Sequence, residues 1–131
     1  MREPVWLDRM DCLAIHEMML AQHGGRPGTR DEGLLESALS KPRNLFAYGS
    51  PTLPEMAASY AAGIINNHPF FDGNKRTGFL AAATFFELNG LVLNATEESV
   101  VEKTLALAGG HLTESDYASW LKTSSSRRSD S

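Results

Sequence analysis

The sequence predicts an all-α domain of about six helices in a bundle, with one apolar helix buried at its centre. Apolar residues recur at helical spacing along most of the chain, and glycine or proline ends most such segments. The apolar segment Leu91–Leu93 is too short to support a sheet by itself. The 131 residues fit one domain, and a content of 42% hydrophobic and 21% charged residues excludes a disordered or coiled-coil chain.

The first two helices are expected in the N-terminal third of the chain. Asp8 is a suitable N-cap for the first helix, which should end near Gly24. Thr29 and Glu32 have the spacing of a capping box for the second helix. Pro42 is expected to stop that helix, because proline lacks the backbone N–H that a helix interior requires.

The third and fourth helices flank a proline. Pro54 fits the first turn of the third helix, which should end near His68 because Pro69 disfavours helical geometry in the residue before it. The fourth helix is expected over residues 74–89 and is apolar on nearly every side. Such a helix is typical of the centre of a bundle, so it is the predicted central helix.

Two shorter helices and a tail complete the chain. Thr96 is a suitable cap for the fifth helix, and Thr113 with Asp116 begins the sixth. The predicted domain spans residues 1–122, and residues 123–131 form a serine-rich segment that we expect to be a flexible tail.

Charge and hydropathy exclude several classes of function. The formal net charge of −4 argues against direct binding of nucleic acid. The longest apolar run, residues 78–86, is too short to cross a membrane, and residues 1–4 show no apolar signal region. Cys12 is the one cysteine, so a disulfide framework is excluded. We therefore expect a cytoplasmic protein.

The start of the fourth helix departs from local rules. Lys75 and Arg76 lie in its first turn, where the helix dipole makes each cation unfavourable by about 0.3–1 kcal/mol. The free N–H groups at the same end can bind an anion. A phosphate bound there would explain both cations, and Gly73 would let it approach closely. The pattern therefore predicts a phosphate site.

Two neighbouring residues extend this site. Asp72 would repel a phosphate unless a divalent cation lay between them, and Mg²⁺ is commonly held by a carboxylate and phosphate oxygens. His68 could accept the proton of an attacking hydroxyl. The alternative is that His68 bonds to backbone at a helix end and Asp72 is an N-cap. For either residue alone the alternative is favoured, whereas the combination favours a functional site.

Two other motifs are excluded. Residues 73–77 lack an intact P-loop core, and no strand precedes them. His68 and Asp72 have no third ligand at suitable spacing for a zinc site.

Residues 68–76, His-Pro-Phe-Phe-Asp-Gly-Asn-Lys-Arg, resemble the signature of the Fic/Doc superfamily, specifically its death-on-curing (Doc) branch. Residues 33–39 and 86–90 are also similar to that branch, and the likeness extends over roughly residues 5–121. The resemblance implies a six-helix Fic-type fold and a toxin of a type II toxin–antitoxin system.

The resemblance also implies roles for the signature residues. His68 would be the base, and Asp72 would hold Mg²⁺. The catalytic set would be His68, Asp72 and Arg76. Backbone amides around Gly73, Asn74 and Lys75 would bind the phosphates of ATP, and Arg76 would bind them too and neutralise their charge.

The implied activity has two forms. AMP-transferring Fic enzymes carry a second glycine where Lys75 stands and a second arginine where Phe79 stands. The Doc branch has lysine at the first place, and it implies transfer of the γ-phosphate of ATP to a threonine or serine of a protein, with elongation factor Tu as the expected target and a block of translation as the result. AMP transfer is the alternative, and a non-catalytic nucleotide- or antitoxin-binding module is a second alternative.

The resemblance further implies control by a partner. The self-inhibitory motif [ST]-x-x-x-E-[GN] is absent, because the residue four before Glu32 is Gly28. We expect a cognate antitoxin whose C-terminal segment binds an apolar groove. Residues 43–54 are expected to be either a flap that aligns the target chain or a plain connector.

Overall fold

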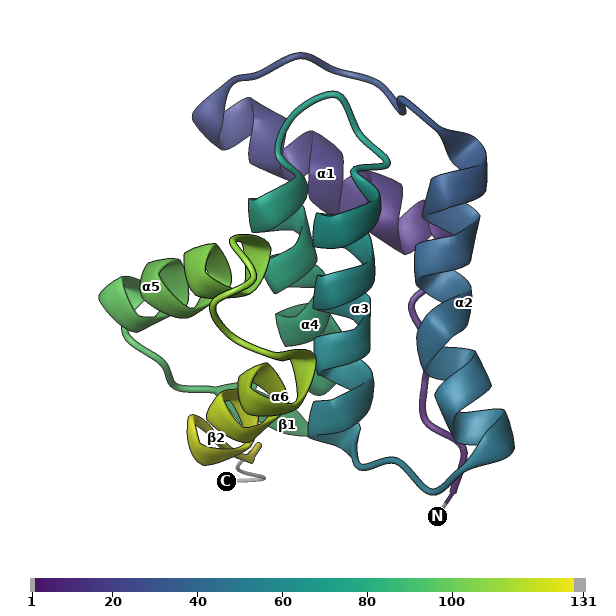
Figure 1. The fold of residues 1–131 in the computed structure, drawn as a ribbon, viewed down its shortest axis with the longest axis vertical. Helices are drawn as coiled ribbons and strands as arrows, with labels where there is room; N and C mark the ends of the chain where they lie inside the picture. The colour runs from purple at the N-terminus through teal and green to yellow at the C-terminus, as the bar shows by residue number, and fades with distance from the viewer. Residues whose placement is uncertain (1, 129–131) are drawn as a thin grey trace.

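The computed structural model describes residues 2–128 and confirms a mostly helical fold (Figure 1). Within these residues, six helices accompany a small antiparallel sheet of two strands. The helices are α1 (Arg9–His23), α2 (Glu32–Tyr48), α3 (Leu53–Asn67), α4 (Asn74–Leu88), α5 (Glu97–Ala108) and α6 (Glu114–Thr123). The strands are β1 (Leu91–Leu93) and β2 (Ser125–Arg127).

Side-chain caps fix the start of most helices. The predicted caps of α1, α5 and α6 are confirmed: the side chains of Asp8, Thr96 and Thr113 each accept a hydrogen bond from a first-turn amide. In α3, Thr52 and Glu55 form a reciprocal capping box. Because each cap satisfies an amide that the helix itself leaves free, these starts follow from local sequence.

Helix α2 differs from its prediction at both ends. Its N-cap is Asp31, whose side chain accepts from the amide of Leu34, and not Thr29. The helix also continues through Pro42 to Tyr48. The proline removes one backbone hydrogen bond, but its ring is fully buried, and that packing offsets the loss.

Helix α3, and not α4, lies at the centre of the bundle (Figure 1). Every residue from Met56 to Ile65 is buried, which requires neighbours on all sides. Helix α4 packs closely on α3 through Gly78, where an added Cβ would lie 2.9 Å from Ile65 Cγ1. The apolar composition of α4 suggested the central place, but one of its faces instead lines the pocket described below.

The segment expected to be a flexible tail forms strand β2, which pairs antiparallel with β1. The amides of Asn94 and Arg128 continue the pairing at its two ends, with hydrogen bonds of 2.6 and 2.8 Å. The structure therefore differs from the expectation for residues 123–128, and the rest of that expectation, residues 129–131, lies outside the described residues. The domain boundary at residue 122 stays a prediction.

No helix found between residues 2 and 128 combines the length and the apolar character that a membrane crossing requires.

Candidate functional site

Among residues 2–128, no side chain caps the N-terminus of α4. Its N-cap is Gly73, with left-handed angles (φ 78°, ψ 16°), and no side chain of these residues accepts from its first-turn amides. Lys75 and Arg76 are exposed in that turn, and neither lies within ion-pair distance of a carboxylate in the described part of the chain. Free amides and two unneutralised cations thus lie together, which is the arrangement that binds an anion.

The side chain of Asn74 points inward and holds the loop that precedes α4. Its Oδ1 accepts from the amide of Phe70 at 3.1 Å, and its Nδ2 donates to the carbonyl of Phe70 at 2.9 Å. Because the residue is 5% exposed, only its backbone can serve an external ligand. The phosphate contact predicted for Asn74 is through its backbone amide, and it stays a prediction.

Asn74 also sets the orientation of His68. The two bonds to Phe70 fix the amide, so Nδ2 faces His68 Nδ1 at 3.2 Å. Nδ1 is then the accepting nitrogen, and the neutral ring carries its proton on Nε2.

His68 ends α3 in a strained conformation. Its φ of 51° is the one positive value at a non-glycine position in the described chain. Arg30 stabilises this turn: its Nε donates to the carbonyl of His68 at 2.7 Å and its Nη2 to that of Asn67 at 3.1 Å. A cation at a helix C-terminus is favourable, because it satisfies free carbonyls and complements the dipole.

Asp72 is not the N-cap of α4. Its Oδ2 accepts from the backbone amide of Arg26 at 2.7 Å, whereas Oδ1 accepts no hydrogen bond from the described residues. The guanidinium of Arg26 lies over the ring of Phe71, 3.8 Å from the centroid. The carboxylate is thus held from one side and keeps one oxygen free for a ligand.

The loop between α1 and α2 lies beside residues 68–73, the part of the signature between α3 and α4, here called the signature loop (Figure 1). The amide of Arg30 donates to the carbonyl of Pro69 at 2.7 Å, and that of Phe71 donates to Gly28 at 3.4 Å. Residues 43–54 instead belong to the end of α2 and the start of α3, a helix length away from His68. The interpretation of residues 43–54 as a flap beside the site is therefore wrong.

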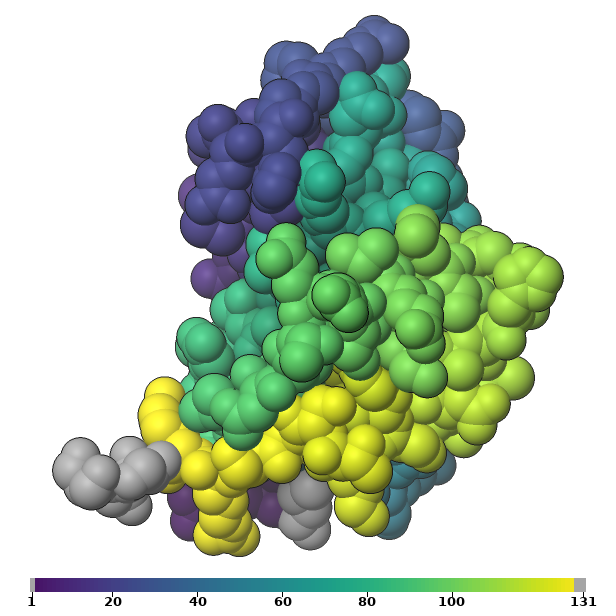
Figure 2. All heavy atoms as spheres, turned by 90° about the vertical axis from the view of Figure 1, so that its left-hand side faces the viewer, coloured from purple at the N-terminus to yellow at the C-terminus, as the bar shows by residue number. Residues whose placement is uncertain are grey.

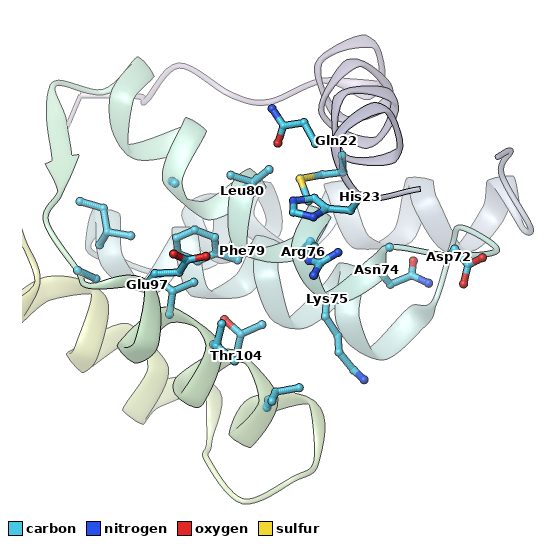
Figure 3. A pocket seen from close by; sticks show the side chains of 18 of the residues that line it. Gln22, His23, Asp72, Asn74, Lys75, Arg76, Phe79, Leu80, Glu97 and Thr104 are labelled. Carbon is cyan, nitrogen blue, oxygen red and sulfur yellow. The ribbon is translucent and has the colours of Figure 1, made fainter. Parts of the chain in front are cut away.

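The six predicted site residues line one pocket of about 1000 Å³. Figure 3 shows Lys75 and Arg76 on α4, with Gln22 and His23 of α1 on one side and Glu97 and Thr104 of α5 on another. In Figure 2, α5 lies between the end of α1 above and β2 below. The remainder of the pocket is mainly apolar, and its lining includes Phe79, Leu80, Ala83, Leu93, Val100, Val101 and Leu105.

Comparisons with known proteins identify the family of the chain. A family model described as the Fic/DOC family matches residues 6–86, which include the whole signature loop. The chain belongs to the Fic/DOC family. It is 38% identical over 93 residues to "Toxin Doc" of Mycolicibacterium smegmatis, covering 69% of this chain and 68% of that protein. It is 30% identical over 113 residues to "Protein kinase doc" of Escherichia phage P1, covering 86% and 89%.

The Fic/DOC match ends before α5. The apolar side of the pocket that α5 forms therefore lies outside the matched residues. Phe79 of α4 lies within the match and lines the same pocket. Its ring packs near Trp120, with centroids 6.4 Å apart. This position therefore supplies an apolar wall to the pocket.

Three residues that support the Fic/DOC signature were not predicted as site residues. His16, Arg26 and Arg30 all come from α1 or the loop after it, and each bonds to backbone or side chain of residues 67–72. No local sequence pattern indicates these three residues, because their partners lie 38 to 56 residues away along the chain.

Proposed function

We propose that this chain is a Doc-like toxin that transfers the γ-phosphate of ATP to a threonine or serine hydroxyl of a protein. The uncapped N-terminus of α4, with Lys75 and Arg76 in its first turn and His68 beside it, carries the proposal. Phosphoryl transfer depends mainly on positioning and neutralising charge, and this end of α4 offers both. The relatives named as a Doc toxin and a Doc protein kinase support the same activity.

In the proposed reaction, His68 accepts the proton of the target hydroxyl. The hydroxyl oxygen then bonds to the γ-phosphorus, the bond from that phosphorus to the bridging oxygen breaks, and ADP leaves. To accept at Nε2, the ring must carry its own proton on Nδ1. The 3.2 Å contact from Asn74 must then break, while the 2.9 Å bond from Asn74 to Phe70 can remain.

The first-turn amides of Gly73, Asn74 and Lys75 would bind phosphate oxygens, and the Arg76 guanidinium would neutralise their charge. Lys75 stands where the AMP-transferring pattern has a glycine, and its side chain would crowd the anion hole used for the α- and β-phosphates. Phe79 likewise supplies no second cation further along α4. Both departures favour transfer of the terminal phosphate over transfer of AMP.

Asp72 fits a Mg²⁺ ion that is shared with the nucleotide. One carboxylate oxygen is free, and no group of three or more potential metal-binding side chains occurs in residues 2–128. Mg²⁺ is typically held by one or two carboxylates together with substrate phosphates, so a single acidic ligand suffices. When bound, the ion would neutralise charge on the phosphate oxygens.

A cognate antitoxin would bind the apolar part of the pocket. Val101 and Leu105 of α5 are about half exposed there, at 51% and 52%. An amphipathic segment could bury these side chains along α5. Elongation factor Tu is the proposed target of the uninhibited toxin, and a block of translation in the cytoplasm is the proposed effect.

The experiment for this proposal uses ATP labelled separately at the γ- and α-phosphates, with Mg²⁺ and a bacterial lysate. We expect a protein band labelled from the γ-phosphate only, and no band with the His68→Ala variant. Label from the α-phosphate would support AMP transfer instead. Nucleotide binding without labelling of any protein would support a non-catalytic binding module.

Growth provides a second test. Expression of the wild type without an antitoxin should arrest growth, whereas His68→Ala should not. Equal growth of the two strains, at equal protein levels, would contradict the catalytic toxin.

A further inference from the structure

His16 is a buried histidine that the proposed reaction does not use directly. It lies in α1, is 3% exposed, and stacks on Phe70 with ring centroids 3.8 Å apart and planes 9° apart. Its Nε2 lies 2.9 Å from the carbonyl oxygen of Asp72. Because a carbonyl oxygen only accepts, Nε2 carries the hydrogen. One side chain of α1 thus holds one peptide group of the signature loop.

The same peptide group carries the amide of Gly73. A trans peptide is planar, so its C=O and N–H point in opposite directions. With the carbonyl of Asp72 directed at the buried ring of His16, the N–H of Gly73 is directed away from that ring. Gly73 lines the pocket and His16 does not, so the hydrogen bond turns this amide out of the core toward the proposed phosphate.

Glycine makes this orientation easy to lose. Gly73 adopts φ 78°, and a residue without Cβ can exchange between such conformations at little cost. If the peptide between Asp72 and Gly73 flipped, the carbonyl would replace the N–H and repel a phosphate. No side chain of the described residues caps α4, and the helix itself engages the next carbonyl, that of Gly73, through the amide of Thr77 at 2.9 Å.

We propose that His16 is a positioning residue, which locks the peptide between Asp72 and Gly73 so that the Gly73 amide faces the phosphate. Donation to the carbonyl also polarises the peptide and makes its N–H a stronger donor. The consequence for catalysis rests on the proposed function, whereas the orientation of the peptide does not.

Two variants separate the hydrogen bond from the packing of the ring. His16→Phe keeps an aromatic ring against Phe70 but lacks the donor, and His16→Gln keeps an N–H that can reach the same carbonyl. Calorimetric titration of the full chain with ATP and Mg²⁺ should show affinity reduced about tenfold in His16→Phe, the equivalent of about one lost hydrogen bond. His16→Gln should bind closer to the wild-type affinity. Thermal unfolding identifies the temperature at which all three proteins are folded.

Equal affinity of wild type and His16→Phe would overturn the proposal. An equal loss in both variants would also overturn it, because packing of the imidazole would then explain the effect.

The amide resonance of Gly73 tests the orientation without nucleotide. In ¹H–¹⁵N spectra it should shift in His16→Phe and stay near its wild-type position in His16→Gln. If His16→Phe does not fold, His16→Met supplies a donor-free side chain that also fills the core. An unchanged Gly73 resonance in the folded donor-free variant overturns the proposal. Failure of the wild type to bind ATP would instead overturn the proposed function. The test of the Gly73 orientation would remain valid, because it uses no nucleotide.

Discussion

At the scale of single residues, the site depends on a strained histidine and the side chain that stabilises it. A positive φ at a non-glycine residue costs of the order of 1 kcal/mol, and it persists only where the surroundings hold it. His68 has such a φ, and two hydrogen bonds from Arg30 hold the last carbonyls of α3. We therefore expect Arg30 to contribute to the proposed function through the backbone that positions His68.

Substitution of Arg30 tests this contribution. We expect Arg30→Ala to reduce γ-phosphate transfer and to lower the free energy of unfolding by about 1 kcal/mol, since both hydrogen bonds are lost. Activity assays and urea unfolding measure the two effects. Arg43→Ala is the matched control, because Arg43 lies near Trp6, 5.3 Å from the ring centroid, and outside the pocket lining. Equal activity of Arg30→Ala and wild type would contradict the role.

The sequence was sufficient to identify the residues of the motif but not those that support them. Lys75 and Arg76 could be found because two cations in a first turn break a local rule. Asn74 was expected to bind phosphate through its backbone amide, whereas the hydrogen bonds of its side chain to Phe70 were not predicted. His16 and Arg26 break no local rule, because their roles exist only once α1 and the signature loop are brought together.

At the scale of elements, local signals predicted most helix starts, and tertiary contacts decided the exceptions. Both ends of α1, α3, α4 and α5, and the start of α6, follow caps, glycines or prolines that can be recognised in the sequence. Helix α2 passes through Pro42 because the ring is buried against the rest of the bundle. Strand β2 forms only because β1, more than thirty residues earlier, offers an edge.

The corrected N-cap of α2 can be tested directly. Asp31→Ala should lower the free energy of unfolding by about 1 kcal/mol, because the amide of Leu34 loses its acceptor. Thr29→Ala should have a smaller effect, since Thr29 meets Phe70 through a backbone bridge. Chemical denaturation of both variants measures the two effects. A larger loss of unfolding free energy in Thr29→Ala than in Asp31→Ala would support the capping box expected from the sequence.

At the scale of the whole molecule, burial of one cysteine thiol and two tyrosine hydroxyls predicts that the folded protein loses stability at alkaline pH. Burial raises the pKa of Cys12, Tyr60 and Tyr117 to about 12. In the unfolded chain the pKa of a cysteine is about 8.5 and that of a tyrosine is about 10. Above those values the unfolded state loses protons that the folded state retains. Stability is therefore fully present below about pH 8.5 and falls as the pH rises toward about 12.

Urea unfolding between pH 8 and pH 11 measures this loss. At pH 8, Tyr117→Phe should be about 1 kcal/mol less stable than wild type, because the 3.0 Å hydrogen bond with Thr104 is lost. The difference in the free energy of unfolding between the two proteins should be smaller at pH 11. At that pH, ionisation of Tyr117 in the unfolded chain also lowers the stability of the wild type. Tyr48→Phe is the control, because Tyr48 is 91% exposed. Constant wild-type stability across this range would be inconsistent with the raised pKa values.

The central claim is that the amides and cations at the N-terminus of α4 serve transfer of a terminal phosphate, with His68 as the base. The most direct measurement is the intact mass of purified elongation factor Tu after incubation with this protein, ATP and Mg²⁺. We predict an increase by one phosphate with the wild type and no increase with His68→Ala. An increase by the mass of AMP, or an equal phosphate increase with His68→Ala, would contradict the claim.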